Sequence, residues 1–527
     1  MFSKHAFSLR QLGLLLLCAA WLLPGLVGHA PWKGGDGEHF VQLWLLLQSG
    51  AAPQAVSATP PLYYWVAMAT AWLTSPILEL ADGARLASGL FIALALFFVA
   101  RAARVLYGAE AGWAAALILL GCIGLLVRGH ELNAATAQFA AAAIMLYGIA
   151  GLPRGARSGG VFGAGALGGG TALMLLAGGA AEAALFLTLA ALSPLVMAEY
   201  RSPAAYRALA WSVGGALLFG AAWLAFLATQ QIPLKNAFNL HRWLGGEGLR
   251  PGYYFGILGW YAWPAWPLAA WAVYRGRRQW RTPDIVLPAG ALLGLLGLYA
   301  LDAHPGEEQG LILLLPLALL GANGLFTLRR GAANALLWFG VTLFGFIALV
   351  LWVYWSAHDL GIPARLAGRL TRLGLTGVGE LRPWALALGL VATLIWLGFL
   401  MRVQRSPLRP VLVWTASMTF IWVLLMALFQ APLDRRLSYA SVGEALAARV
   451  PSADCIQTVQ VRSQQRLLLA YHSGRRLAPA DIGCNWLLVE TRRREVEPHV
   501  PADWVKQWEG ARPGDRSDRF HLYGRRR

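Results

Sequence analysis

Long apolar stretches recur along most of this chain and restrict what it can fold into. A helical run of about 18 to 22 apolar residues crosses a hydrocarbon layer of about 30 Å. Backbone amides inside that layer must be satisfied within their own segment, so such stretches are helices. They lie at 11–28, 85–103, 108–127, 133–150, 161–178, 182–198, 208–228, 256–274, 283–301, 310–327, 333–354, 384–401 and 410–430. The sequence therefore predicts an α-helical polytopic membrane protein with about 13 transmembrane helices.

Charged residues are scarce and unevenly placed. They make up 13% of the chain, about half the share typical of a soluble domain. The last 97 residues hold 28 of them, whereas the first 430 hold 42. We therefore predict a transmembrane domain over 1–430 and a soluble domain over 431–527. Within the first, 29–84 is too interrupted for a clean crossing and is predicted to be an outer loop with helices on the membrane surface.

Basic residues set the expected orientation. With the N-terminus inside, the cytoplasmic segments hold 17 basic and three acidic residues, and the outer loops hold ten basic and twelve acidic. Because cytoplasmic loops are enriched in Lys and Arg, we expect the soluble domain outside. Pro31 follows the first span and disfavours cleavage there, so that span is expected to remain as an anchor. Most basic residues of the body lie in short loops between spans, so the net charge of +18 points to membrane lipids rather than nucleic acid as partners.

The soluble tail has the pattern of a small α/β domain. Helices are expected at 441–450 and 464–471, and strands at 455–461, 485–490 and 519–523. This alternation favours a mixed or parallel sheet. Cys455 and Cys484 both lie in this domain, which we place in an oxidising compartment, so a disulfide between them is expected as one of two alternatives, the other being free thiols.

Two segments of the outer loop carry a resemblance to a known family. Trp32–Phe40, which reads Trp-Lys-Gly-Gly-Asp-Gly-Glu-His-Phe, resembles the acidic signature of GT-C glycosyltransferases, membrane enzymes that use polyprenyl-phosphate-linked sugars. Thr59–Trp65, which reads Thr-Pro-Pro-Leu-Tyr-Tyr-Trp, is similar to a Lys-Pro-Pro-Leu-x-Tyr-Trp segment of one branch, and Arg85-Leu-Ala-Ser88 follows at the usual distance. That branch contains the bacterial lipid A aminoarabinose transferases and the protein O-mannosyltransferases. The resemblance covers the whole layout and implies a GT-C-like fold in the bacterial inner membrane, with a periplasmic C-terminal domain.

The resemblance implies an inverting sugar transfer from a polyprenyl-phosphate donor to a lipid, glycan or protein acceptor. Such a transfer needs a base for the acceptor proton and cations for the departing phosphate. The acidic signature gives Asp36 as the base, with a solvated loop acid as the alternative. Glu38 is the fallback, since Gly37 shifts the usual adjacent acid by one place. Glu131 is a second acid expected to face the same cavity.

Residues expected to bind the donor lie in the outer loops. They are Lys33, Tyr63, Tyr64, Arg128, His241, Arg242 and Arg250. The guanidinium fork of arginine suits a phosphate group. His241 lies where the resembling enzymes hold a histidine near the donor; interfacial anchoring is the alternative role for His241 and Arg242.

The sequence also departs from the family pattern. Thr59 replaces the lysine before the two prolines, Asn133 replaces an aspartate opening the fourth span, and 178–182 lacks a lysine found after the fifth span. These departures keep a catalytically inactive envelope scaffold open as an alternative function. A transporter or flippase is the other alternative, although such proteins place ionisable residues near mid-membrane and the predicted spans contain essentially none there.

No cofactor is expected. Asp302–Glu308 offers oxygen ligands and one imidazole but no recognised metal spacing, so a divalent cation is only a minor alternative. The glycine-rich stretch 159–170 lacks the Gly-Lys-Ser/Thr of a phosphate-binding loop and is predicted to allow close helix packing instead.

Overall fold

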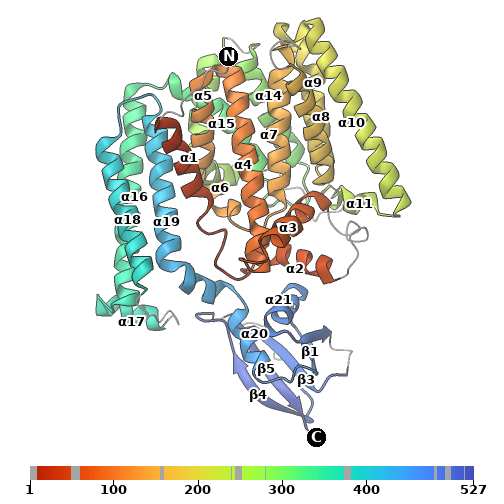
Figure 1. Cartoon of the computed structure of the whole chain (residues 1–527), viewed down its shortest axis with the longest axis vertical. Helices are drawn as coiled ribbons and strands as arrows, with labels where there is room; N and C mark the ends of the chain where they lie inside the picture. The colour runs from red at the N-terminus through yellow and green to blue at the C-terminus, as the bar shows by residue number, and fades with distance from the viewer. Residues whose placement is uncertain are drawn as a thin grey trace. The chain divides into compact units, whose positions relative to one another are not determined.

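The computed structural model describes most of the chain as helices followed by a small sheet (Figure 1). The described residues are 9–48, 60–154, 160–238, 240–243, 252–278, 281–372, 382–479, 483–492, 500–515 and 517–526. Contacts divide the chain into two compact units. Unit 1 comprises Met1–Leu26, Leu46–Phe344 and Trp396–Phe420, and unit 2 comprises Val27–Leu45, Gly345–Ile395 and Ile421–Arg527. Unit 2 thus includes both the predicted tail and part of the expected outer loop.

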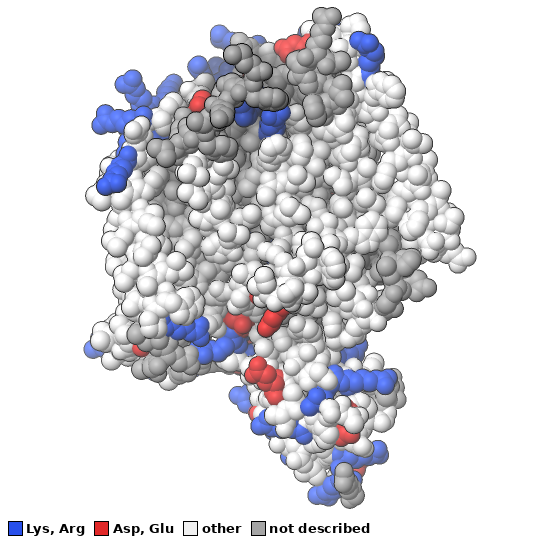
Figure 2. Space-filling view, in the orientation of Figure 1, with Lys and Arg blue, Asp and Glu red and all other residues white. Residues whose placement is uncertain are grey.

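Unit 1 is built of helices, and its longer ones overlap the predicted apolar stretches, apart from the helix at Pro61–Thr74, which lies in the segment expected to be an outer loop. They are α1 (Leu9–Leu22), α3 (Pro61–Thr74), α4 (Leu80–Tyr107), α5 (Ala109–Leu120), α6 (Ile123–Gly129), α7 (Ala135–Gly151), η2 (Leu152–Arg154), α8 (Gly160–Leu176), α9 (Ala180–Val196), η3 (Ala198–Arg201), α10 (Pro203–Thr229), α11 (Leu234–Ala237), η4 (Leu240–Arg242), α12 (Tyr253–Tyr261), α13 (Ala265–Gly276), α14 (Pro283–Tyr299) and α15 (Leu311–Phe326). A broad band without Lys, Arg, Asp or Glu among the coloured residues crosses the middle of the visible face of the helical body (Figure 2). An uncharged band of this kind is what a hydrocarbon layer requires.

The structure shows a polytopic helical membrane fold, but the expected number of 13 crossings stays a prediction. Among the described residues, five helices are long and apolar enough to cross a membrane, or six if the bent pair α5–α6 counts as one span. The remaining apolar helices have 10–17 residues. Two predicted spans are broken. The stretch 108–127 bends by 67° between α5 and α6, and 256–274 consists of α12 and α13 with a turn between them.

Close approach of α7 and α8 explains the glycine-rich stretch. A Cβ atom on Gly148 would lie 2.5 Å from the backbone nitrogen of Leu167, which real Cβ atoms do not tolerate. A Cβ on Gly163 would lie 3.1 Å from the carbonyl carbon of Gly151, and one on Gly170 would lie 2.8 Å from the Met145 side chain. The predicted packing role of this stretch is therefore confirmed.

Unit 2 contains the small C-terminal sheet domain and the ends of several long helices. Its elements are α17 (Ala364–Arg372), α20 (Ala440–Ala447), α21 (Ser463–Ser473), β1 (Cys455–Val459), β2 (Arg476–Pro479), β3 (Trp486–Arg492), β4 (Trp504–Gly510) and β5 (Asp518–Arg525). Four helices have residues in both units: α2 (Gly35–Gln48), α16 (Arg330–Asp359), α18 (Pro383–Arg402) and α19 (Arg409–Leu437).

The sheet of the tail is mixed, as predicted. Its strand order is β2-β1-β3-β5-β4, with β2, β1 and β3 parallel and β3, β5 and β4 antiparallel. Leu468, Leu488, Phe520 and Leu522 are fully buried and form part of its core. The helices and three of the strands lie where the sequence placed them, whereas β2 and β4 were not predicted. The four-residue β2 ends in a proline, so it gives little strand signal and fits only an edge position.

Candidate active site

The Pro-Pro-Leu-Tyr-Tyr-Trp and Arg-Leu-Ala-Ser segments of unit 1 meet in one chain of hydrogen bonds. Pro61 opens α3, where its fixed φ suits the first helical position, and Tyr63 is 2% exposed. The Ser88 hydroxyl donates to the carbonyl oxygen of Glu131 (2.7 Å) and lies 2.8 Å from the Tyr63 hydroxyl. The Tyr63 oxygen in turn accepts from the backbone nitrogen of Asn133 (3.0 Å). Tyr63 and Ser88 therefore fix the turn between α6 and α7.

Asn133 holds the same turn through its side chain. It is fully buried, its amide nitrogen donates to the carbonyl oxygen of Arg128 (3.2 Å), and its amide oxygen accepts from the backbone nitrogen of Ala135 (2.9 Å). An ionised aspartate, which only accepts, would lose the bond to Arg128. The asparagine that departs from the family pattern thus joins the end of α6 to the start of α7.

Arg128, at the end of α6, lies between two carboxylates. Its Nη1 is 3.2 Å from Glu131 Oε2, and its Nη2 is 2.7 Å from Glu307 Oε2. The side chains of Arg128 and Glu131 are each 24% exposed and that of Glu307 is 30% exposed. The Tyr261 hydroxyl donates to the carbonyl oxygen of Glu307 (2.7 Å) and fixes that side of the group. We call these three charged residues the Arg128 cluster.

Arg242 lies in a second group of one arginine and two carboxylates. Its Nη2 is 2.5 Å from Asp302 Oδ2, and its Nη1 is 3.3 Å from Glu182 Oε1. The side chains are almost completely buried, at 6% exposed for Arg242, 0% for Asp302 and 2% for Glu182. The guanidinium also lies 5.4 Å from the ring centre of Tyr299. We call these three charged residues the Arg242 cluster. Its two carboxylates already pair with the guanidinium.

Asp36 is a buried residue of unit 2. It lies in the first turn of α2, is 1% exposed, and its Oδ2 accepts from the backbone nitrogen of Trp32 (2.8 Å). The solvated-loop alternative for this acid is thereby excluded. Gly37 beside it must be glycine, since a Cβ there would lie 2.6 Å from the carbonyl oxygen of Trp32 and 3.0 Å from Leu468.

The segment that carries Asp36 is fastened within unit 2 by residues distant in sequence. The indole nitrogen of Trp32 donates to Asp434 Oδ1 (3.0 Å), and the backbone nitrogen of Ala30 donates to the same oxygen (3.0 Å). Gln464, on α21, donates to the carbonyl oxygen of Gly34 (3.0 Å). Phe40 meets the ring of Tyr471 edge-on at 4.7 Å.

The remaining predicted residues differ in accessibility. Lys33 and Glu38 are exposed, and Tyr64 is 3% exposed. Thr59 and Arg250 lie outside the described residues, as does the side chain of His241.

The structure brings some of the predicted residues together. Tyr63, Arg128 and Glu131 form one connected group in unit 1, while Arg242 belongs to a separate cluster. Asp36, Glu38 and Lys33 belong to unit 2. The sequence did not predict the pairing of Arg128 with Glu307, which are 179 positions apart, or of Arg242 with Glu182. Both acids lie in loops noted in the sequence, but the sequence gives no signal for their partners.

The acidic loop expected as a minor cation site pairs with arginines instead. Asp302 binds Arg242 and Glu307 binds Arg128. Within the described part of the chain, no three His, Cys, Asp or Glu side chains are grouped so that they could hold a metal ion.

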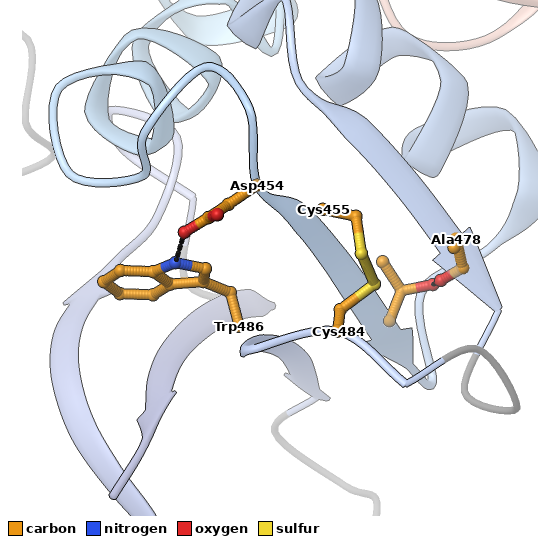
Figure 3. The surroundings of a disulfide bond; sticks show 6 residues. Asp454, Cys455, Ala478, Cys484 and Trp486 are labelled. Atoms are coloured by element: carbon orange, nitrogen blue, oxygen red, sulfur yellow. Dashed lines mark hydrogen bonds between the residues drawn. A yellow bond between two sulfur atoms is a disulfide. The ribbon is translucent and has the colours of Figure 1, made fainter. Parts of the chain in front are cut away.

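The tail contains a disulfide and a half-buried histidine. Cys455 and Cys484 are bonded, with their Cα atoms 5.4 Å apart, and tie the start of β1 to the residues before β3 (Figure 3). Beside them, the indole nitrogen of Trp486 donates to Asp454 Oδ2 (2.9 Å; Figure 3). Burial lowers the pKa of His472 on α21 to about 4, so this residue is neutral near pH 7.

The helical body and the C-terminal sheet domain define a GT-C-like membrane fold. Among solved structures, the chain is similar to ArnT from Cupriavidus metallidurans bound to undecaprenyl phosphate, with a TM-score of 0.67, 15% identity and 97% of each chain covered. The apo structure of the same ArnT matches with a TM-score of 0.62 and 17% identity, over 89% of this chain and 86% of that one. The expected fold is therefore confirmed. No family model and no curated protein matches the sequence.

Proposed function

We propose that this chain is a membrane glycosyltransferase of the bacterial inner membrane. It moves a sugar from a polyprenyl-phosphate donor to a lipid, glycan or protein acceptor at the periplasmic face, with inversion at the anomeric carbon. The proposal is supported by the fold shared with ArnT bound to undecaprenyl phosphate and by the acidic and Pro-Pro-Leu-Tyr-Tyr segments of the outer loop.

The Arg128 cluster is the observation that carries this proposal. Arg128 is a partly exposed guanidinium at the end of α6, and the loop that follows it is held by Tyr63 of the Pro-Pro-Leu-Tyr-Tyr-Trp segment and by Ser88 of the Arg-Leu-Ala-Ser segment. A cation held in this way can stabilise the charge that grows on a departing phosphate without rearranging first. We therefore assign the donor phosphate to Arg128 rather than to Arg242, whose guanidinium is buried against two carboxylates.

Glu307 pairs with the Arg128 nitrogen that does not contact Glu131. A carboxylate and a phosphate present similar pairs of oxygens to a guanidinium, and Glu307 lies 2.7 Å from Nη2. We propose that the donor phosphate displaces Glu307 from this nitrogen while Glu131 keeps Nη1 in place. Glu307 then lowers the affinity for the donor and keeps the arginine ordered when the site is empty.

Asp36 is our proposed base, and Glu131 the second acid. In the reaction, the acceptor oxygen bonds to the anomeric carbon while the bond from that carbon to the phosphate oxygen breaks. The electron pair leaves with the polyprenyl phosphate, and the acceptor proton passes to the carboxylate. The fixed position of Asp36 supports this role, because its Oδ2 accepts from the backbone nitrogen of Trp32 (2.8 Å) and holds the carboxylate in one orientation.

The test is a transfer assay with purified full-length protein and labelled polyprenyl-phosphate sugars. Asp36→Asn should lower transfer by about 10²-fold or more, since a positioned general base contributes about 10²–10⁴-fold. It should leave folding intact, because the amide oxygen can still accept from Trp32. Glu38→Gln is the control at an exposed position of the same helix turn and should cost less. Full activity of Asp36→Asn would remove Asp36 from the mechanism.

An inactive envelope scaffold is the competing function that the family departures support. Thr59 and Asn133 remove a lysine and an aspartate that the resembling enzymes carry. If no polyprenyl-phosphate sugar is consumed by wild-type protein that is folded and binds the donor, the scaffold function replaces the enzymatic one.

A further inference from the structure

A separate pocket lies in unit 2, where the ends of three long helices meet. It encloses about 300 Å³ of free space including its open mouth, and it is lined by residues of α16, α18, α19 and the segment before α18. One wall is apolar, with Trp355 and Ala385 8% and 4% exposed. None of its residues belongs to the Arg128 cluster or to the Asp36 segment.

The opposite side of the pocket is polar and mostly cationic. Arg382, Arg435, His358 and Asp359 line it. His358 Nδ1 lies 3.1 Å from Asp359 Oδ2, and the lining as a whole holds two guanidinium groups and one carboxylate. Arg382 is exposed and has no side-chain ion pair within the described residues.

His358 is an independent indication that something binds here. It is 6% exposed, and its Nε2 is buried with no hydrogen-bond partner among the described residues. A buried polar atom without a partner is costly, and native proteins usually supply one, from the protein, from water or from a ligand.

The neighbouring helix α17 carries a matching charge pattern. Arg365, Arg369 and Arg372 are spaced by four and three residues and share one face, while Leu370, on another face, is 7% exposed. A short basic amphipathic helix of this kind suits a surface of anionic headgroups. Figure 2 shows Lys and Arg side chains gathered around the α17 end of α16, α18 and α19.

We propose that this pocket binds the phosphate of an anionic phospholipid headgroup. Arg382 and Arg435 pair with the phosphate oxygens, His358 supplies a further polar contact through Nε2, and the Trp355 wall packs against the apolar part of the lipid. Charge-assisted bonds from arginine favour a phosphate that lacks a compensating cation, so phosphatidylglycerol suits the pocket better than phosphatidylcholine. This site is distinct from the proposed sugar-transfer site and does not depend on that proposal.

Native mass spectrometry of the detergent-purified full chain tests the proposal. Titrated dioleoyl phosphatidylglycerol should show one saturable high-affinity site, and phosphatidylcholine with the same chains should not. Arg382→Gln and Arg435→Gln should each weaken the site about tenfold. Ala385→Leu keeps every charge but fills the pocket, and should weaken it as well. Arg402→Gln, at the other end of α18, is the matched control and should bind as the wild type does.

Competition with inorganic phosphate distinguishes a pocket for free phosphate anions from a pocket for a lipid headgroup. Displacement of the lipid by millimolar phosphate would assign the pocket to phosphate anions in general, and persistence of the lipid would assign it to the headgroup with its glycerol and chains. Equal binding of both lipids, or wild-type affinity in Ala385→Leu, would overturn the proposal even if the arginine variants did not fold. An equal loss in Arg402→Gln would also overturn it.

Discussion

The Arg128 and Arg242 clusters have the same composition and opposite surroundings. Each consists of one arginine between two carboxylates that come from distant parts of unit 1. The side chains of the first are 24–30% exposed, whereas those of the second are 0–6% exposed. The two clusters therefore differ in how deeply their side chains are buried and not in the types of residue that form them.

This difference decides what each arginine can do. At a partly exposed position, the two contacts of Arg128 are worth less than buried ones and can be exchanged for those of a ligand. In the interior, removal of Arg242 would leave two buried carboxylates without a counter-charge, which is far costlier than the pair itself is worth. A phosphate can thus compete for the first arginine, while the second holds together the residues that surround it.

The largest expected effect is on stability at the buried cluster. Arg242→Gln should lower the free energy of unfolding by about 3–5 kcal/mol, because both buried carboxylates lose their partner. Thermal unfolding of the detergent-purified protein measures this. Adding Asp302→Asn to the same variant removes one of the stranded charges and should recover part of the loss. A stability loss below about 1 kcal/mol would make the two clusters equivalent.

The next effect is on catalysis at the exposed cluster. Arg128→Gln should lower transfer by about 10²–10³-fold, the usual cost of losing one donor to a developing anion. Its free energy of unfolding should change by less than about 1 kcal/mol, as for other exposed ion pairs. Transfer rates and unfolding curves of the same preparation check both statements. A variant that is unstable yet fully active would reverse the assignment of the two arginines.

A smaller effect is expected from the hydroxyl that fixes the turn carrying Arg128. Tyr63→Phe leaves the buried backbone nitrogen of Asn133 without its acceptor, at a cost of about 1–3 kcal/mol. The Arg128 loop loosens as a result, so kcat should fall along with stability while donor KM rises. Tyr64→Phe is the neighbouring control, and an equal loss there would argue against a specific role for the Tyr63 chain.

The smallest effect concerns the carboxylate that competes with the donor. Glu307→Gln removes a negative charge from the proposed phosphate position, so donor KM should fall about two- to tenfold with little change in kcat. Steady-state kinetics over a range of donor concentrations would show it. Glu308→Gln is the adjacent control and should do less. If Glu307→Gln raises KM instead, the carboxylate helps to bind the donor and does not compete with it.

Local patterns predicted most of the helices but not their interruptions. The apolar stretches coincide with helices because 18 or more apolar residues have no other stable arrangement in a bilayer. The bend between α5 and α6 at Gly121 was missed because its cause is distant. A Cβ at this glycine would lie 2.9 Å from Trp414, which follows almost 300 residues later.

The sequence predicted several residues of the candidate site but not which residues they would pair with. Arg128, Glu131 and Tyr63 stood out as charged or family-like residues in outer loops, and they do form one group. The difference between Arg128 and Arg242 could not be seen, because burial depends on which loops fold over which helix ends. The structural use of Asn133 was hidden for the same reason, since its partners are backbone atoms.

The fastening of α2 to α21 has a consequence for how this protein could be recombined. Gly34, Gly37 and Phe40 contact the side chains of Gln464, Leu468 and Tyr471, so the acidic segment and the tail share one interface. A chimaera that exchanged tails at position 430 would keep one parent's acidic segment against the other parent's helix. A workable crossover would have to transfer both pieces from the same parent, although some 400 positions separate them. In this chain, the acidic segment and the tail have to be exchanged together.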